Sequence, residues 1–181
     1  MAVKVLLTAE DLYEMSGIGR SELVRGELVK MTPSGGEHGK LTIAIGALLL
    51  SFVKPRKLGQ IFGAETGLFT GHDPDTVRAV DAMYVSNARL EQVDDLTKFL
   101  PVAPDLVVEV VSPTDRWSEI EEKVTEYLGI GVRLVWVVNP KTHSVHIYRP
   151  SSDVRRIVES DTLEGEDVLP GFSVPVKELF E

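Results

Sequence analysis

The chain has 181 residues, 43% of them hydrophobic and 26% charged, which is typical of one globular domain with a substantial core. It contains no cysteine, and this excludes disulfide bonds, thiolate metal sites and thiol nucleophiles. The formal net charge of −9 argues against tight nucleic-acid binding over a broad basic surface, although a nuclease with a small contact surface remains compatible with it.

Two apolar segments bear on location. Residues 1–7 form too short an apolar run for a signal peptide. The longest apolar stretch, residues 41–53, is interrupted by Thr42, Gly46 and Ser51 and is too short to cross a bilayer. We therefore expect a cytoplasmic protein with no membrane-spanning segment.

The N-terminal part of the chain predicts a short helix and then a hairpin. Residues 8–15 favour a helix, because Thr8 can act as its N-cap and acidic residues occupy its first turn. Residues 22–29 are typical of two short strands joined by a tight turn at Arg25 and Gly26.

A long buried helix is expected next. The segment from Ser34 to Glu37 has the spacing of a capping box, and the helix should run to about Val53 and end before Pro55. One face of this helix would carry His38, Leu41, Ile45, Leu48, Leu49 and Phe52.

The rest of the chain predicts a sheet between helices. The apolar segment 132–138 is typical of a strand covered on both faces, and residues 118–128 favour a helix that ends near Gly129. The other expected elements are strands at 59–69, 78–86, 105–112, 144–149 and 154–158, a polar connection at 87–104, and a tail at 169–175 that packs on an edge and leads to a last short helix. These elements predict a single α/β domain over residues 1–181, with a mixed β-sheet flanked by helices.

Two acidic side chains lie inside valine-rich predicted strands. Strand alternation puts Glu109 on one face with Val107 and Val111, and it puts Asp81 on a face with Ala79 and Met83. A buried carboxylate is costly unless it is paired, so each acid either meets an arginine, lies on an exposed edge or binds a cation. Two such acids in neighbouring strands favour a shared divalent cation.

Lys123 follows the Glu109 strand on the next helix, on or beside its apolar stripe. It could be a lysine whose stem covers the core, or it could form an i,i+4 pair with Glu119. Its position directly after the Glu109 strand favours a catalytic role.

Other candidate residues have common structural explanations. His38, near a helix N-terminus, could be a core histidine with a local hydrogen bond or could contact a metal or a phosphate. Glu22, Glu27 and Glu65 are strand acids that more often serve structure than catalysis. Trp117, Trp136 and Tyr148 are interpreted as packing residues. The chain has no phosphate-binding loop, no dinucleotide glycine motif, no nucleophile elbow and no zinc pattern.

These residues resemble the Uma-type restriction endonuclease family of the PD-(D/E)xK phosphodiesterase superfamily. The resemblance covers nearly the whole chain and lies in residues 22–28, 36–39, 77–81, 103–113, 122–123, 127, 131–138 and 169–172. It implies the restriction-endonuclease fold, a homodimer, and an Mg²⁺ or Mn²⁺ ion held by Asp81, Glu109 and the main-chain carbonyl of Val110. His38, Glu27, Glu65 and Tyr127 are further candidates for the site.

The sequence departs from the superfamily pattern at two positions. Val80 precedes Asp81 where the pattern has proline, and Val111 stands where it has lysine. The resemblance implies that the lysine has moved to the following helix as Lys123. The function it implies is metal-dependent hydrolysis of phosphodiester bonds in a nucleic acid, with DNA favoured over RNA as the substrate. The alternatives are a non-catalytic dimeric binding module that retains the nuclease fold, and a hydrolase for another phosphate ester.

Overall fold

The computed structural model describes residues 5–181, without the side chains of Ala64 and Ser152, so part of the N-terminal segment considered for a signal peptide lies outside the described residues. None of the helices in this part of the chain is long and apolar enough to cross a membrane. In chain order the elements are α1 (Ala9–Glu14), β1 (Ser21–Val24), β2 (Glu27–Lys30), α2 (Gly36–Arg56), β3 (Gly59–Gly71), β4 (Thr76–Ser86), α3 (Asn87–Leu90), β5 (Leu106–Val110), α4 (Trp117–Gly129), β6 (Leu134–Asn139), η1 (Pro140–Thr142), β7 (Ser144–Arg149), β8 (Ser152–Val158), β9 (Thr162–Glu164), β10 (Ser173–Pro175) and η2 (Val176–Leu179).

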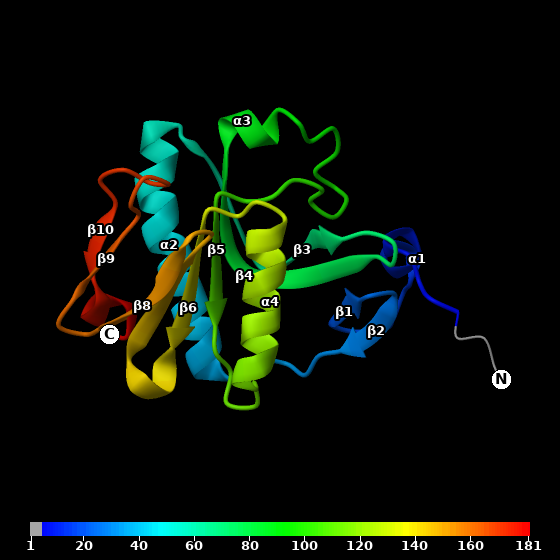
Figure 1. The fold of residues 1–181 in the computed structure, drawn as a ribbon, viewed down its shortest axis with the longest axis horizontal. Helices are drawn as coiled ribbons and strands as arrows, with labels where there is room; N and C mark the ends of the chain where they lie inside the picture. Colours follow the sequence, from blue (N-terminus) through cyan, green and yellow to red (C-terminus); the bar gives the residue numbers. More distant parts are fainter. Residues whose placement is uncertain (1–4) are drawn as a thin grey trace.

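A mixed eight-stranded sheet lies between two long helices, which confirms the predicted fold class. Its strands run in the order β2-β1-β4-β5-β6-β7-β8, with β3 also paired to β4. Figure 1 shows α4 in front of this sheet and α2 behind it. Alternate β5 residues divide between the two faces: Val108 packs in the cluster that contains α2, and Val107 packs in the cluster that contains α4. The two helices thus cover both faces, which explains the continuous apolar character of β5 and β6.

Two different strands pair with one edge of β4 and leave a gap between them. On the opposite edge, β3 pairs with β4 from Gly59↔Ser86 to Gly71↔Thr76. The free edge is therefore shared by β1, which pairs at Val77, and β5, which pairs at residues 82–84. No ladder pair joins residues 78–81 to either strand within the described chain. We call this opening the fork, and it brings side chains of β1, β4 and β5 to one place.

The predicted hairpin and first helix are confirmed. The Thr8 hydroxyl accepts a hydrogen bond from the Asp11 amide at 3.1 Å, which makes Thr8 the N-cap of α1. The turn between β1 and β2 has positive φ at Arg25 and Gly26. A Cβ on Gly26 would come within 2.7 Å of the Leu6 side chain, so this turn position requires glycine.

Two local predictions were wrong. Ser34 does not cap α2, because the N-cap is Gly35 and the Ser34 hydroxyl instead accepts a hydrogen bond from Arg20. The helix also does not stop before Pro55 but includes it in the last turn, where a missing N–H costs only one hydrogen bond. Trp117, interpreted as a packing residue, packs edge-on against His146 with 4.8 Å between ring centroids, although it is 38% exposed and donates its Nε1–H to Glu121.

Candidate active site

The fork is the floor of a groove of about 660 Å³. Polar and charged residues from β1, β2, α2, β4, β5 and α4 line it. The groove is bounded on one side by the N-terminal half of α4 and on the other by the β1–β2 hairpin and the start of α2. The site residues that line it are Glu22, His38, Arg78, Asp81, Glu109, Val110 and Lys123.

Asp81 is fixed in orientation by groups from two elements. Its Oδ2 atom accepts a hydrogen bond from the Val110 amide at 2.8 Å and lies 3.2 Å from Nε2 of His38. The hydrogen bond to Asp81 raises the pKa of His38, because it favours the protonated ring. The structure therefore brings His38 directly to Asp81 and extends the site to α2.

Glu109 is nearly inaccessible to solvent and lies beside another acid. Burial raises the pKa of Glu109 to about 7, and the charge of Asp81 acts in the same direction against the opposing effect of Lys123. The Tyr127 hydroxyl donates a hydrogen bond to Oε1 of Glu109 at 2.5 Å, and Lys123 Nζ lies 3.7 Å from Oε2. Tyr127, which does not line the groove, thus orients Glu109 from the core side.

Lys123 points into the fork and is not a surface lysine. Its Nζ atom lies 2.8 Å from Oε1 of Glu22, closer than to Glu109. Burial alone would lower the pKa of Lys123, but Glu109 and Glu22 outweigh it and raise the pKa above its usual value. The expected alternative pair with Glu119 is not formed in the described chain, because that carboxylate accepts a hydrogen bond from the Arg116 amide.

Glu22 is a member of this group that the sequence patterns did not single out. Besides Lys123, it accepts hydrogen bonds from the Ala79 amide and from Arg78, both at 3.1 Å. Arg78 also donates two hydrogen bonds, of 2.6 and 2.7 Å, to the Glu126 carboxylate. The sequence feature that could have pointed to Glu22 is Arg78, because a charged residue within an apolar strand needs an acidic partner on a neighbouring element. The identity of that partner depends on the pairing of β1 with β4.

The charges at the fork favour a divalent cation. Four carboxylates, those of Glu22, Asp81, Glu109 and Glu126, face two permanent cations, Arg78 and Lys123. Glu22 and Glu126 pair with Arg78, and Glu22 also lies 2.8 Å from Lys123. Asp81, whose partner is His38, and Glu109, which lies 3.7 Å from Lys123, are therefore the less compensated acids. Within residues 5–181, the Val110 amide and the His38 ring both donate to the same oxygen of Asp81, Oδ2.

The donor set suits a magnesium-like ion. No three His, Asp or Glu side chains within residues 5–181 already form a metal cluster. Mg²⁺ commonly binds through one or two carboxylates and completes its shell with water and substrate oxygens. Two hard oxygen donors on a groove wall therefore fit this ion better than they fit zinc, which prefers three or four nitrogen and sulfur ligands.

Two other candidate acids lie away from this group. Glu27 is exposed and lies opposite Val24 in the hairpin. Glu65 is exposed and forms an ion pair with Arg20, with 2.6 Å between Oε1 and Nε. Neither residue lines the groove, so the structure does not bring them to Asp81 and Glu109.

The raised pKa of Glu109 predicts a pH-dependent difference in stability. In metal-free protein, we expect wild type to lose stability relative to Glu109→Gln as the pH rises from 4.5 to about 7. Over this range the unfolded chain ionises at Glu109 while the folded protein keeps the proton, so rising pH favours unfolding. Below 4.5 both states are protonated, and above about 7 the difference levels off.

Urea unfolding at stepped pH in the presence of a chelator would measure this difference. Glu121→Gln serves as the control, because Glu121 is an exposed glutamate on α4 that does not line the groove. A wild-type minus Glu109→Gln difference that stays constant across the range would contradict the assignment.

Comparison with known proteins gave a match to a family model and a match to a solved structure. The Uma2 family model, described as "Putative restriction endonuclease", matches residues 9–177. No curated protein matches the sequence significantly. A crystal structure described as a putative nuclease belonging to DUF820, from Anabaena variabilis ATCC 29413, is similar with a TM-score of 0.82. The two share 18% sequence identity, and the match covers 96% of this chain and 97% of the other, so the likeness shows a common fold.

Proposed function

Since the chain belongs to the Uma2 family of restriction endonucleases, we propose that it is a divalent-metal-dependent nuclease that hydrolyses phosphodiester bonds in DNA. The observation that carries this proposal is the convergence of Asp81, Glu109 and Lys123 in one groove. Two carboxylates and an ammonium group are the combination that metal-assisted phosphoryl chemistry needs.

The proposed ligands are Asp81, Glu109 and the main-chain carbonyl of Val110. If these residues hold an Mg²⁺ or Mn²⁺ ion, it would supply Lewis-acid polarisation of the phosphate and a lowered pKa for a coordinated water. Asp81 is held ready by the Val110 amide and His38, and Glu109 is held by Tyr127. These contacts reduce the reorganisation needed when the carboxylates bind a cation.

Lys123 is proposed to stabilise the negative charge that develops on the phosphoryl oxygens during in-line attack. Val111, at the superfamily lysine position, is an apolar residue packed in the cluster under α4. Lys123 nevertheless brings an ammonium group to within 3.7 Å of Glu109 from α4. This distance supports the view that the lysine has moved to the helix and kept its role.

The net charge of −9 favours the second candidate function, a non-catalytic dimeric module that binds a partner. It also suits a nuclease that touches only a short stretch of DNA through cationic groove residues such as Arg20 and Lys30. A homodimer is retained in the proposal, because two copies would present two sites to two strands.

Calorimetric titration of Mn²⁺ separates these two functions. We expect one Mn²⁺ site in the wild type and at least about a tenfold loss of affinity in Glu109→Ala, because a direct carboxylate ligand is removed. The same two proteins are then assayed on plasmid DNA with Mn²⁺ or Mg²⁺. Mn²⁺ binding with cleavage supports the nuclease, whereas equal titrations and no cleavage would support the binding module.

A further inference from the structure

We propose that Glu22 is a positioning residue that anchors the Lys123 ammonium and is not a ligand of the metal. The inference deepens the proposed nuclease function, and its catalytic meaning rests on that function. It assigns separate roles to the three acids at the fork: Asp81 and Glu109 would hold the cation, and Glu22 would hold the lysine.

The carboxylate oxygens of Glu22 are already occupied by protein donors. Oε1 accepts from the Ala79 amide at 3.1 Å and lies 2.8 Å from Lys123 Nζ. Oε2 accepts from Arg78 at 3.1 Å. A cation at Glu22 would have to displace an ammonium or a guanidinium group, whereas Asp81 faces no permanent cation at such distances in the described chain.

The charge state of Glu22 agrees with an anchoring role. Burial alone would raise the pKa of Glu22, but the adjacent Lys123 and Arg78 hold it below its usual value. This direction agrees with a carboxylate that is paired with both cations. The distances make Glu22 the nearer counter-ion of Lys123, at 2.8 Å against 3.7 Å for Glu109, so the lysine would keep a partner if Glu109 bound a metal.

Glu22 is held in place through Arg78, which is itself fixed by further hydrogen bonds. Arg78 binds Glu126 with two parallel hydrogen bonds, and the Thr70 hydroxyl donates to Glu126 at 3.0 Å. A bidentate arginine–carboxylate pair fixes both partners in orientation as well as in distance. The chain of contacts therefore ties the β1–β2 hairpin, β3 and β4 to α4 at the point where Lys123 projects.

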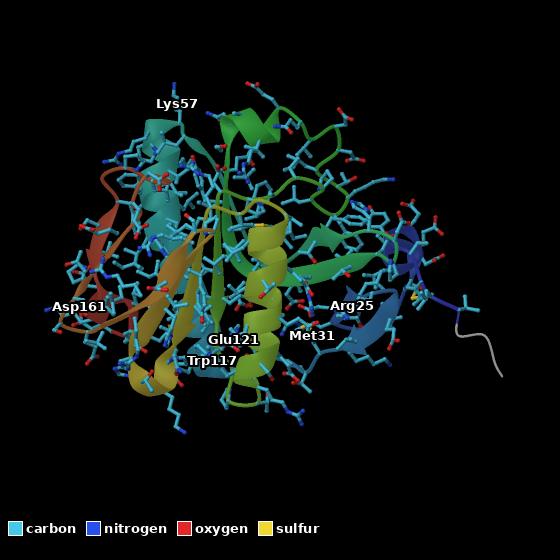
Figure 2. The ribbon with its side chains drawn as sticks, viewed as in Figure 1. Arg25, Met31, Lys57, Trp117, Glu121 and Asp161 are labelled. Atoms are coloured by element: carbon cyan, nitrogen blue, oxygen red, sulfur yellow. The ribbon has the colours of Figure 1, made fainter. Side chains whose placement is uncertain are left out.

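A second contact joins the hairpin to α4 at the surface. Arg25 in the β1–β2 turn lies 3.3 Å from a carboxylate oxygen of Glu122, the residue before Lys123. Figure 2 shows Arg25 and Met31 on the side of α4 that faces the hairpin, whereas Glu121 and Trp117 lie on the side toward β6 and β8. The β1–β2 hairpin therefore forms one wall of the groove and also positions the Lys123 side chain. In this way a lysine on α4 can take the place of one that directly follows Val110.

Glu22→Gln tests the assignment through the titration of Lys123, followed by ¹³C NMR of its labelled Cε. Loss of the adjacent anion should lower the pKa of Lys123 relative to the wild type, and Glu22→Asp should restore most of the difference because it keeps the charge. Mn²⁺ binding should persist in Glu22→Gln with less than about a tenfold loss of affinity. Single-turnover DNA cleavage should fall by about 10- to 100-fold, as expected for residues that orient a catalytic group.

Glu121→Gln is the matched control, since it makes the same chemical change on the outer side of α4 and should leave both the titration and Mn²⁺ binding unchanged. An unaltered Lys123 pKa in Glu22→Gln, or a loss of Mn²⁺ binding as large as that in Glu109→Ala, would overturn the inference. If Glu22→Gln does not fold, the smaller change Glu22→Asp decides, because it must retain the elevated Lys123 pKa while slowing cleavage. A wild-type protein that cleaves nothing would refute the nuclease function alone, because the titration and Mn²⁺ binding still test the anchor.

Discussion

Asp81→Asn is expected to abolish Mg²⁺- or Mn²⁺-dependent DNA cleavage, with a loss of at least about 10³-fold. Removal of a charged metal ligand should slow the reaction more than removal of a single neutral hydrogen-bond donor to a developing oxyanion. Asparagine keeps the shape of the side chain and an oxygen that can still accept the Val110 amide hydrogen bond. The fold should therefore survive, and the loss should come from the missing negative charge. Single-turnover cleavage of plasmid DNA and Mn²⁺ titration of the same sample would measure both effects.

Lys123→Ala provides the second arm of this experiment. It should abolish cleavage while leaving an Mn²⁺ site, because Lys123 is proposed to act on the phosphate and not on the metal. Asp153→Asn is a suitable control, since Asp153 is exposed on β8 at the far end of the sheet order from the hairpin. Undiminished cleavage by purified Asp81→Asn or Lys123→Ala would show that the activity resides elsewhere.

Arg78→Met should lower the free energy of unfolding by about 3–5 kcal/mol, the usual cost of removing one partner of a buried ion pair. Arg78 is 6% exposed and is the counter-ion of both Glu22 and Glu126. Methionine fills a similar volume, so the cost would arise from two carboxylates left without their cation and not from a cavity. Urea unfolding at neutral pH would measure it.

Arg25→Met is the matched control for this prediction. Its side chain is 73% exposed, and its ion pair with Glu122 should contribute only about 0–1 kcal/mol. Combining Arg78→Met with Glu126→Gln should recover part of the loss, because one uncompensated charge is then removed. Equal effects of the two arginine substitutions would mean that the network at the fork is not a significant source of stability.

The sequence by itself determined the kinds of element and their approximate limits. The 2.0 and 3.6 residue periods are local properties, so they identified β4, β5 and α4 and placed Asp81, Glu109 and Lys123 on apolar faces. The errors were also local and came from competition between possible partners. Ser34 had the spacing of a helix cap, but its hydroxyl accepts a hydrogen bond from Arg20, which directly precedes β1.

Only the tertiary structure decided which charges meet. Glu22 and Lys123 are about a hundred residues apart, and their contact exists because β1 and β5 share one edge of β4 and part at residues 78–81. No periodicity encodes that opening, since it depends on long-range strand pairing and on α4 crossing over it. For the same reason the sequence indicated Asp81 and His38 as candidates but could not predict that they are in contact. It also could not distinguish Glu22, which is proposed to anchor Lys123, from Asp81 and Glu109, which are proposed to bind the metal.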